Sequence, residues 1–261
     1  MGIKYLKVFG ERNTGTNYLN QLLNQNLVDI NILNIGSNQG IQEVANQYSS
    51  HLRELVKEFQ IDLRRNQEFS YNYGWKHAVV DVERVKNVSI YEETIFICLI
   101  RNPYKFGRSL FKRPYQTLVR DWSSFSEFLR TPWVCNNRDN AGSAILQSPI
   151  TLWNLKVKSY IEFAKTCKNL ITIRYEDLVA DPKKTLSSLN EFDVKNKGSF
   201  INIETSTKDE SLKFDDYVSA SKSFNPRDYY SQDDLSYMAT ILDHDICQYF
   251  AYDILQEDKS D

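Results

Sequence analysis

One apolar run constrains the fold more than any other feature of the chain. After Thr94, the six residues Ile-Phe-Ile-Cys-Leu-Ile follow one another without a polar side chain. Such a run is typical of a strand that is buried on both faces of a parallel sheet. Shorter apolar runs at 5–9 and 170–173 alternate with helical patterns. The sequence therefore predicts an α/β fold with a central parallel sheet flanked by helices.

The remaining elements are predicted from periodicity and capping residues. Further strands are expected at 28–35 and 73–80, and helices after residue 16, at 41–59, 103–112 and 125–129, from Ser148-Pro149, from Asp181-Pro182 and over 231–251. Proline at the first helical position suits three of these helix starts. The chain contains no internal repeat and no Pro/Gly/Ser-rich linker. Residues 1–261 are therefore expected to form a single domain.

Composition excludes several classes of protein. The hydrophobic fraction is 41% and the charged fraction 25%, as in an ordinary globular protein. A net charge of −2 gives no general attraction to nucleic acid or to an anionic membrane, so an anion site must be a local cluster of Arg and Lys. The four cysteines lack metal-site spacing and are expected to be reduced thiols. Without a membrane-spanning stretch or a signal-peptide core, a cytoplasmic location is expected.

The loop after the first strand is a candidate anion site. It links the apolar run at 5–9 to a helical pattern of leucines, and the free N–H groups and dipole of a helix start attract phosphate. Gly15 permits close approach, Thr14 and Thr16 carry hydroxyls, and Arg12 supplies a planar charged fork. An ordinary strand–turn–helix explains the pattern equally well. No Gly-Lys-Ser or Gly-Lys-Thr occurs here, so the Walker A loop that binds ATP and magnesium is absent.

Polar clusters follow four predicted strands. They are the Gly15 loop, Lys76-His77, the stretch from Arg101 to Ser109, and Tyr175-Glu176. Ligands of open α/β sheets bind beyond the carboxyl ends of the strands. The four clusters are therefore expected to meet in one site.

These clusters resemble the sulfotransferase family that uses 3′-phosphoadenosine 5′-phosphosulfate (PAPS). The loop Asn13-Thr14-Gly15-Thr16-Asn17-Tyr18 is similar to the family's phosphosulfate loop, and Arg101 with Ser109 matches the spacing of its 3′-phosphate motif. Tyr175-Glu176-Asp177 resembles the segment beside the nucleotide, and Trp75-Lys76-His77 resembles the strand end that carries the general base. The resemblance spans residues 5 to 190 and implies a P-loop-like sulfotransferase fold.

The resemblance implies a role for each matching residue. PAPS, the co-substrate, is expected to bind Arg12, the loop from Asn13 to Tyr18, Arg101, Ser109 and Tyr175. His77 is the expected general base, with Arg12 and Lys76 stabilising charge on the sulfuryl group. Tyr18 is the candidate for stacking on adenine. The scheme requires no metal.

Three departures from the family pattern are visible. Asn13 occupies the position of the loop lysine, so Arg12 or another residue must supply that cation. Lys76 and His77 are adjacent, and neighbours on a strand point to opposite faces, so both can face the sulfuryl group only if the strand has already ended. The family's late basic loop is not recognisable, and Lys222 or Arg227 is the candidate substitute.

The acceptor is left open by the sequence. A small molecule or a carbohydrate hydroxyl is the candidate, with segments 41–72 and 113–147 as candidate acceptor loops. The apolar stripe within 41–59 fits a surface helix or an insertion near a cleft. In 113–147, four arginines and two tryptophans fit either a site for an anionic glycan or a solvated surface over two core tryptophans: Arg113, Arg120, Arg130, Arg138, Trp122 and Trp133.

Two rival functions remain. One is a kinase-like phosphoryl transferase, which the missing Walker lysine disfavours. The other is a non-catalytic nucleotide-binding module of the same fold, which the Asn13 departure favours.

Overall fold

A four-stranded parallel sheet forms the centre of the chain. The computed structural model describes residues 2–34, 36, 38–115, 122–205 and 211–255. The strands lie in the order β3-β1-β4-β7, with β3 at Asn31–Ile32, β1 at Tyr5–Gly10, β4 at Thr94–Ile100 and β7 at Leu170–Arg174. The register pairs Tyr5 with Thr94 and Phe96 with Leu170. The prediction of one α/β domain on a parallel sheet is confirmed.

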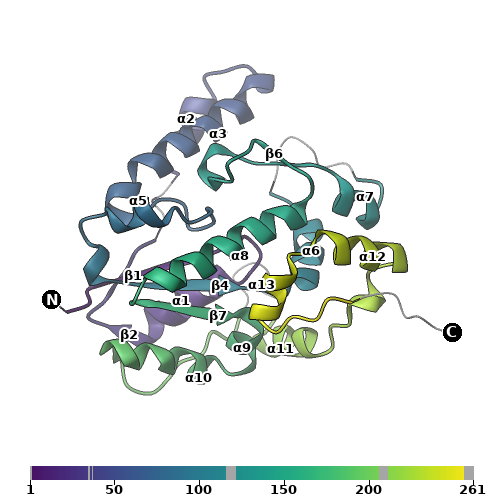
Figure 1. Cartoon of the computed structure of the whole chain (residues 1–261). Helices are drawn as coiled ribbons and strands as arrows, with labels where there is room; N and C mark the ends of the chain where they lie inside the picture. The colour runs from purple at the N-terminus through teal and green to yellow at the C-terminus, as the bar shows by residue number, and fades with distance from the viewer. Residues whose placement is uncertain (1, 35, 37, 116–121, 206–210, 256–261) are drawn as a thin grey trace.

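Helices cover both faces of this sheet (Figure 1). On one face lie α6 (Pro103–Lys112), α7 (Phe125–Arg130), α8 (Pro149–Thr166), α12 (Gln232–Ile241) and α13 (His244–Tyr249). On the other face lie α1 (Thr16–Asn26), α9 (Tyr175–Ala180) and α10 (Pro182–Ser187). The remaining helices are α2 (Ile41–Ala45), α3 (Ser50–Gln67), α4 (Phe69–Asn72), α5 (Val82–Lys86) and α11 (Phe214–Lys222).

Strand β4 explains why two cores exist. All seven of its residues are buried. Ile95, Ile97 and Leu99 pack into the core beside α1, whereas Phe96, Cys98 and Ile100 pack into the core beside α8. Alternate side chains of a strand point to opposite faces, so a fully apolar run requires cover on both.

Helix starts are where sequence and structure agree most closely. The Asn102 side chain accepts hydrogen bonds from the backbone of Tyr104 and Lys105, which starts α6 at Pro103. Ser148 caps α8 in the same way, through Ile150 and Thr151. In both helices a short polar side chain satisfies free N–H groups and proline sets the first backbone angle.

The strand predicted at 73–80 is wrong, and two further elements are wrong in part. Residues 73–80 form no strand, because Tyr73 and Gly74 both have positive φ, which breaks an extended run. Of residues 28–35, only β3 joins the main sheet, while β2 (Leu27–Val28) pairs with β8 (Lys195–Asn196). The helix expected over 231–251 is two helices, because Asp243 caps a new one, α13.

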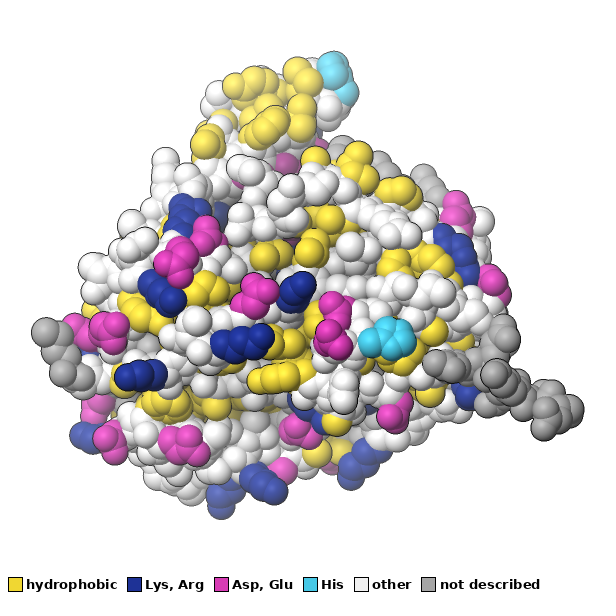
Figure 2. All heavy atoms as spheres, viewed as in Figure 1, with side chains coloured by type: hydrophobic (Ala, Val, Ile, Leu, Met, Phe, Trp, Pro, Cys, Tyr) yellow, Lys and Arg dark blue, Asp and Glu magenta, His cyan; other side chains and the backbone are white. Residues whose placement is uncertain are grey.

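The helix expected over 41–59 is two helices, α2 and α3, and most of its apolar stripe faces solvent. Val44 is half-buried, whereas Leu52, Leu55 and Phe59 are 42–60% exposed, as are the nearby Tyr48 and Leu63. Figure 2 shows hydrophobic side chains gathered at the end of the molecule where Figure 1 places α2 and α3. Helix α3 is thus a surface helix whose buried face carries Ile61 and Arg65 instead.

Two further observations concern the whole described chain. The cysteines are free, with three of them buried and Cys135 half-buried. None of the helices in the described ranges combines the length and the apolar character needed to cross a bilayer.

Candidate functional site

A cavity of about 850 Å³ lies beyond the carboxyl ends of the central strands. It brings together nine of the ten predicted donor-binding residues: Arg12, Asn13, Gly15, Thr16, Asn17, Tyr18, Arg101, Ser109 and Tyr175. Lys76 and His77 line it as well. The three clusters that follow β1, β4 and β7 therefore meet, as expected from their position at strand ends. Lys76 and His77 join them although residues 73–80 form no strand. We call this space the basic cavity.

The charge of the basic cavity is one-sided. Five cationic side chains line it: Arg12, Lys76, Arg101, Lys112 and Arg113. Among the described residues, no Asp or Glu lines it. The whole chain carries a net charge of −2, so this concentration of positive charge is local. Such a wall favours an anion with several charges.

The loop after β1 has the geometry that close approach to an anion requires. Gly15 has a φ of 95° and precedes the first residue of α1. A Cβ at Gly15 would lie 2.7 Å from the Tyr175 ring, so only glycine fits beneath that ring. Thr14 is the one predicted loop residue that does not line the cavity. Its hydroxyl is buried and donates to the carbonyl of Glu11 at 2.5 Å, which braces the turn.

Arg101 is fixed by neutral partners. Its Nη1 donates to the Asn13 carbonyl at 2.6 Å, and its guanidinium lies 4.4 Å from the centroid of the Tyr175 ring. Its Nε is buried and has no hydrogen-bond partner within the described ranges. No carboxylate of the described chain forms an ion pair with it, because Glu176 contacts Lys105 instead. The charge of Arg101 is therefore available to a ligand.

Tyr18 belongs to an aromatic wall of the cavity. Its ring stacks on Phe214 at a centroid distance of 5.6 Å, and its hydroxyl donates to Asn202 at 2.8 Å. Phe214 and Tyr217 come from α11, a helix that the sequence analysis did not predict. Lys222 and Arg227, the predicted late basic residues, are not among the residues that line the cavity.

Lys76 and His77 both reach the cavity because their segment is irregular. The alternation that would send them to opposite faces applies only to a strand. Lys76 donates from Nζ to the Asn17 side chain at 2.9 Å, and its backbone carbonyl accepts from the N–H of Gly10, also at 2.9 Å. The segment is thus attached to the end of β1 without being part of the sheet.

The hydrogen bonding of His77 defines its chemistry. The imidazole is 7% exposed, and Nδ1 contacts the carbonyl oxygen of Gly10. A carbonyl only accepts, so Nδ1 carries the proton and Nε2 keeps its lone pair. Burial, with the nearby charge of Lys76, holds the pKa of His77 well below its ordinary value. The ring is therefore neutral near pH 7 and able to take up a proton at Nε2.

Arg12 is held between two aromatic rings. Its guanidinium lies 5.2 Å from the centroid of the Trp75 ring and 4.3 Å from that of Tyr115. Stacking of this kind orients the planar fork without neutralising its charge. Trp75 and Tyr115 line the cavity too, and the sequence analysis did not single them out.

A buried ionic cluster behind the loop was also missed. Lys156 on α8 forms ion pairs with Glu11 and with Asp139, the latter at 3.1 Å. Burial alone would lower the pKa of Lys156, but the two carboxylates outweigh it and raise that pKa. Glu11 also accepts a hydrogen bond from the Tyr115 hydroxyl at 3.2 Å. The cluster ties the loop after β1 to α8 and to the Tyr115 segment.

One signal in the sequence points to the missed cation Lys112. Lys112 follows Ser109 by three residues, a spacing that puts both on one face of α6, and Arg113 is the cap residue that ends this helix. The Asn13 side chain donates to the backbone carbonyl of Arg113 at 3.2 Å, so the loop and the end of α6 are in direct contact.

The candidate acceptor loops differ in their placement. No residue of 41–72 in the described chain lines the basic cavity, whereas residues 112–115 do. Arg138 is paired with Glu58 and Asp62, Arg130 is paired with two aspartates, and Trp133 is buried. Arg120 lies outside the described residues. Of the three described arginines in this group, only Arg113 lines the cavity.

Three solved structures are similar in fold at low identity. The sulfotransferase domain from the curacin biosynthetic pathway is 13% identical, with a TM-score of 0.46 over 98% of this chain and 99% of that one. The sulfotransferase domain of the Synechococcus PCC 7002 olefin synthase is 14% identical, with a TM-score of 0.49 over 97% and 96%. The sulfotransferase from Alicyclobacillus acidocaldarius is 13% identical, with a TM-score of 0.43 over 84% and 91%.

Sequence comparisons give no match. No protein-family model fits the chain, and no curated protein is significantly similar to it. At the structural scores above, the likeness extends to the fold at most. The function has to be inferred from the basic cavity itself.

Proposed function

We propose that this chain is a sulfotransferase that moves a sulfuryl group from PAPS to an acceptor hydroxyl. The observation that carries the proposal is the basic cavity, which combines five cations, no carboxylate among its described residues and a neutral imidazole. A donor with phosphate groups at two positions and a sulfate matches the positive wall. The imidazole supplies the base that an attacking hydroxyl needs.

Each part of the donor has a matching group. Arg101 and Ser109 bind the 3′-phosphate, since the Arg101 charge has no carboxylate partner in the described chain. The N–H groups at the start of α1 hold the 5′-phosphosulfate, helped by the dipole of the helix. The ring pair of Tyr18 and Phe214 supplies a flat apolar wall for adenine.

The transfer step uses the neutral Nε2 of His77. The acceptor oxygen attacks sulfur while the bond between sulfur and the bridging phosphate oxygen breaks, so adenosine 3′,5′-bisphosphate leaves. The hydroxyl proton passes to Nε2. Lys76 and Arg12 stabilise the charge that develops on the sulfuryl oxygens, and the aromatic rings around Arg12 keep its fork in place.

In this proposal the described chain acts as a single sulfotransferase-like domain. We assign to the acceptor side residues 112–115 and Trp75, which line the same cavity as His77. An acceptor of either kind, a small molecule or a glycan, must bring a hydroxyl to Nε2.

Calorimetry tests the donor site directly. Adenosine 3′,5′-bisphosphate is titrated into wild type and Arg101→Ala, with 5′-AMP and ATP plus magnesium as comparison ligands. We expect binding near 1 μM, about −8 kcal/mol, for the bisphosphate alone, and a Kd weakened roughly 10–100-fold in the variant. Preference for ATP with magnesium would revive the kinase-like rival. Tight bisphosphate binding without transfer to any acceptor of a broad panel would favour the non-catalytic module.

A further inference from the structure

Lys7 is a fully buried lysine in the middle of β1. Its neighbours Leu6 and Val8 point into the core beside α1, so Lys7 points to the opposite face of the sheet. There its Nζ donates to the carbonyl of Asn72 at 2.5 Å and to that of Gly74 at 2.9 Å. Burying an amine is costly unless its N–H groups are satisfied, and these two carbonyls satisfy them.

The two carbonyls belong to the irregular segment that leads to Lys76 and His77. Tyr73 and Gly74 have φ values of 61° and 62°, an unusual pair of left-handed conformations. A Cβ at Gly74 would lie 2.8 Å from the carbonyl oxygen of Arg65, so the turn is closely packed. Neither a helix nor a strand fixes residues 73–77.

β1 therefore contacts this segment at three positions. Lys7 binds its start, the N–H of Gly10 binds the Lys76 carbonyl, and the Gly10 carbonyl binds His77. The last two contacts come from the backbone of β1. Of the β1 groups that make these three contacts, Lys7 Nζ is the one that belongs to a side chain.

Burial and the charged groups around Lys7 act on its pKa in opposite directions. Burial, with the nearby charge of Lys76, lowers the pKa of Lys7 to about 7, although Glu68 opposes that shift and Arg65 adds to it. Both the ammonium and the neutral amine carry at least two N–H groups. Both forms can therefore donate to the two carbonyls.

We propose that Lys7 is a positioning residue, which fixes Lys76 and His77 in the basic cavity by holding the carbonyls of Asn72 and Gly74. The catalytic consequence rests on the proposed function, whereas the structural consequence does not. Lys7 has no place in donor binding, because it is buried behind the segment and does not line the cavity.

The test replaces Lys7 by methionine, which fills similar volume without an N–H group. Lys4→Met is the matched control, since Lys4 is an exposed lysine that pairs with Glu93 before the same strand. The main readout is the NMR spectrum of the histidine ring nitrogens. The chain has three histidines, and His51 and His244 are exposed internal references.

In Lys7→Met we expect the His77 ring nitrogens to lose the pattern of a single Nδ1–H tautomer, while His51 and His244 keep their shifts. We expect kcat to fall at least tenfold and the Kd for adenosine 3′,5′-bisphosphate to change less than threefold, because that ligand lacks the sulfuryl group. Lys4→Met should match wild type in all three readouts. If Lys7→Met is not recovered folded, Lys7→Leu, a smaller apolar side chain that also lacks an N–H donor, takes the same measurements.

Two results would overturn the proposal. One is an unchanged His77 pattern in the Lys7 variant. The other is a loss of bisphosphate affinity as large as the loss of kcat. That result would show that Lys7 supports donor binding as much as the position of His77. If wild type neither binds the bisphosphate nor transfers sulfate, the proposed function fails, and the ring spectra still decide whether Lys7 positions His77.

Discussion

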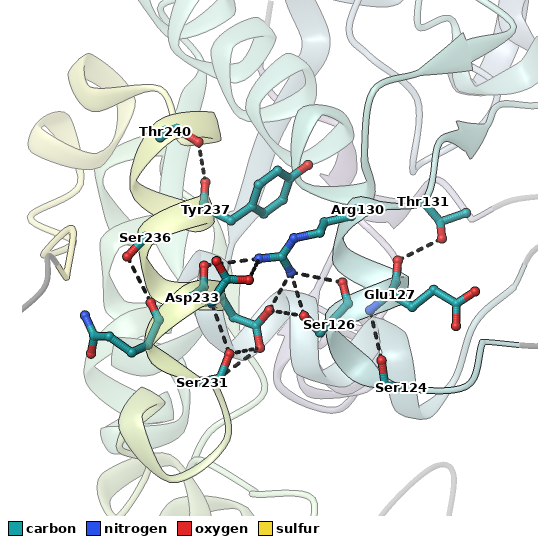
Figure 3. A network of polar contacts seen from close by, with 12 residues as sticks. Ser124, Ser126, Glu127, Arg130, Thr131, Ser231, Asp233, Ser236, Tyr237 and Thr240 are labelled. Carbon is teal, nitrogen blue, oxygen red and sulfur yellow. Dashed lines mark hydrogen bonds and ion pairs between the residues drawn. The ribbon is translucent and has the colours of Figure 1, made fainter.

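Two arginines in this molecule show what pairing does to the same side chain. Arg130, on α7, donates to Asp233 and Asp234 at 2.5 Å each and to Ser126 at 2.7 Å (Figure 3). Arg101 donates to the Asn13 carbonyl, and its Nε has no partner. In Figure 3 the carboxylates come from α12 and the guanidinium from α7, so the pairing joins two helices.

The difference separates a structural arginine from one that is available for binding. Carboxylates neutralise Arg130, which leaves little charge for a ligand. A neutral carbonyl and an aromatic face orient Arg101 but leave its charge intact. The absence of carboxylates from the described wall of the basic cavity is therefore more informative than the number of arginines. Mutations on the two sides should separate function from stability.

The largest expected effect comes from His77→Asn. The asparagine amide can donate to the Gly10 carbonyl as Nδ1 does, but it has no basic nitrogen. We expect kcat to fall by about 10²–10⁴, the usual contribution of a general base. Affinity for the bisphosphate should stay within about twofold. An unchanged kcat with a folded variant would remove His77 from the mechanism.

The pH profile of the wild type should agree with that role. Because the pKa of His77 lies well below 6.5, its imidazole is already neutral at pH 6.5. Protonation of His77 should therefore not lower kcat as the pH falls from 8 to about 6.5. A half-maximal point near pH 6.5 that disappears in His77→Asn would contradict the environment described for this ring.

Arg101→Ala is expected to act on binding alone. Loss of a charged contact to a phosphate costs about 1.5–3 kcal/mol, or roughly 10–100-fold in Kd. The midpoint of denaturant unfolding should change little, because the variant removes no ion pair. Arg101→Lys, which keeps the charge and loses the fork, should bind with intermediate affinity. A large loss of stability in Arg101→Ala would contradict the contrast between Arg101 as a binding residue and Arg130 as a structural one.

Arg130→Ala should show the opposite behaviour. It leaves Asp234 buried without its cation, and the expected loss in the free energy of unfolding is about 1–3 kcal/mol. Urea unfolding measures this loss, and calorimetry on the same variant should give the wild-type Kd for the bisphosphate. Weaker binding at unchanged stability would show that α7 communicates with the cavity.

The smallest expected effect is the pH dependence of the same network. Burial alone would raise the pKa of Asp234, but hydrogen bonds from Ser126, Arg130 and Ser231 outweigh it and lower that pKa. Its stabilising contribution is therefore present above the unfolded pKa of about 3.9 and is lost as the pH falls through the folded value. The stability difference between wild type and Asp234→Asn should shrink between pH 5 and pH 3. A constant difference would exclude ionisation as its source.

Most of the sheet and several helix starts were predictable because local rules decide them. The run after Thr94 has no solvent-facing alternative, and the Asn102-Pro103 and Ser148-Pro149 pairs specify helix starts by their own geometry. The meeting of three of the four clusters followed from one topological rule about strand ends, whereas Lys76 and His77 reach the cavity without a strand before them. The roles of these residues in binding and catalysis stay predictions.

The rest depends on contacts between distant residues. Residues 73–80 have the composition of a strand, but Lys7 and the left-handed turn hold them in another conformation. The Lys156 cluster joins residues that are far apart in sequence, and no pattern within α8 distinguishes a buried lysine. The α3 stripe has helical spacing yet faces solvent, since periodicity identifies an apolar face without saying what covers it.

The order of strands in the sheet has a consequence for synthesis on the ribosome. β1 lies between β3 and β4, and β7 lies outside β4, so each strand of this sheet is added beside one already made. The nascent chain can therefore extend the sheet from β1 outward without opening earlier pairs. The aromatic wall arrives later, with Phe214 and Tyr217 on α11. A nascent chain that has completed β7 therefore holds all five cationic residues of the basic cavity before Phe214 and Tyr217 are made.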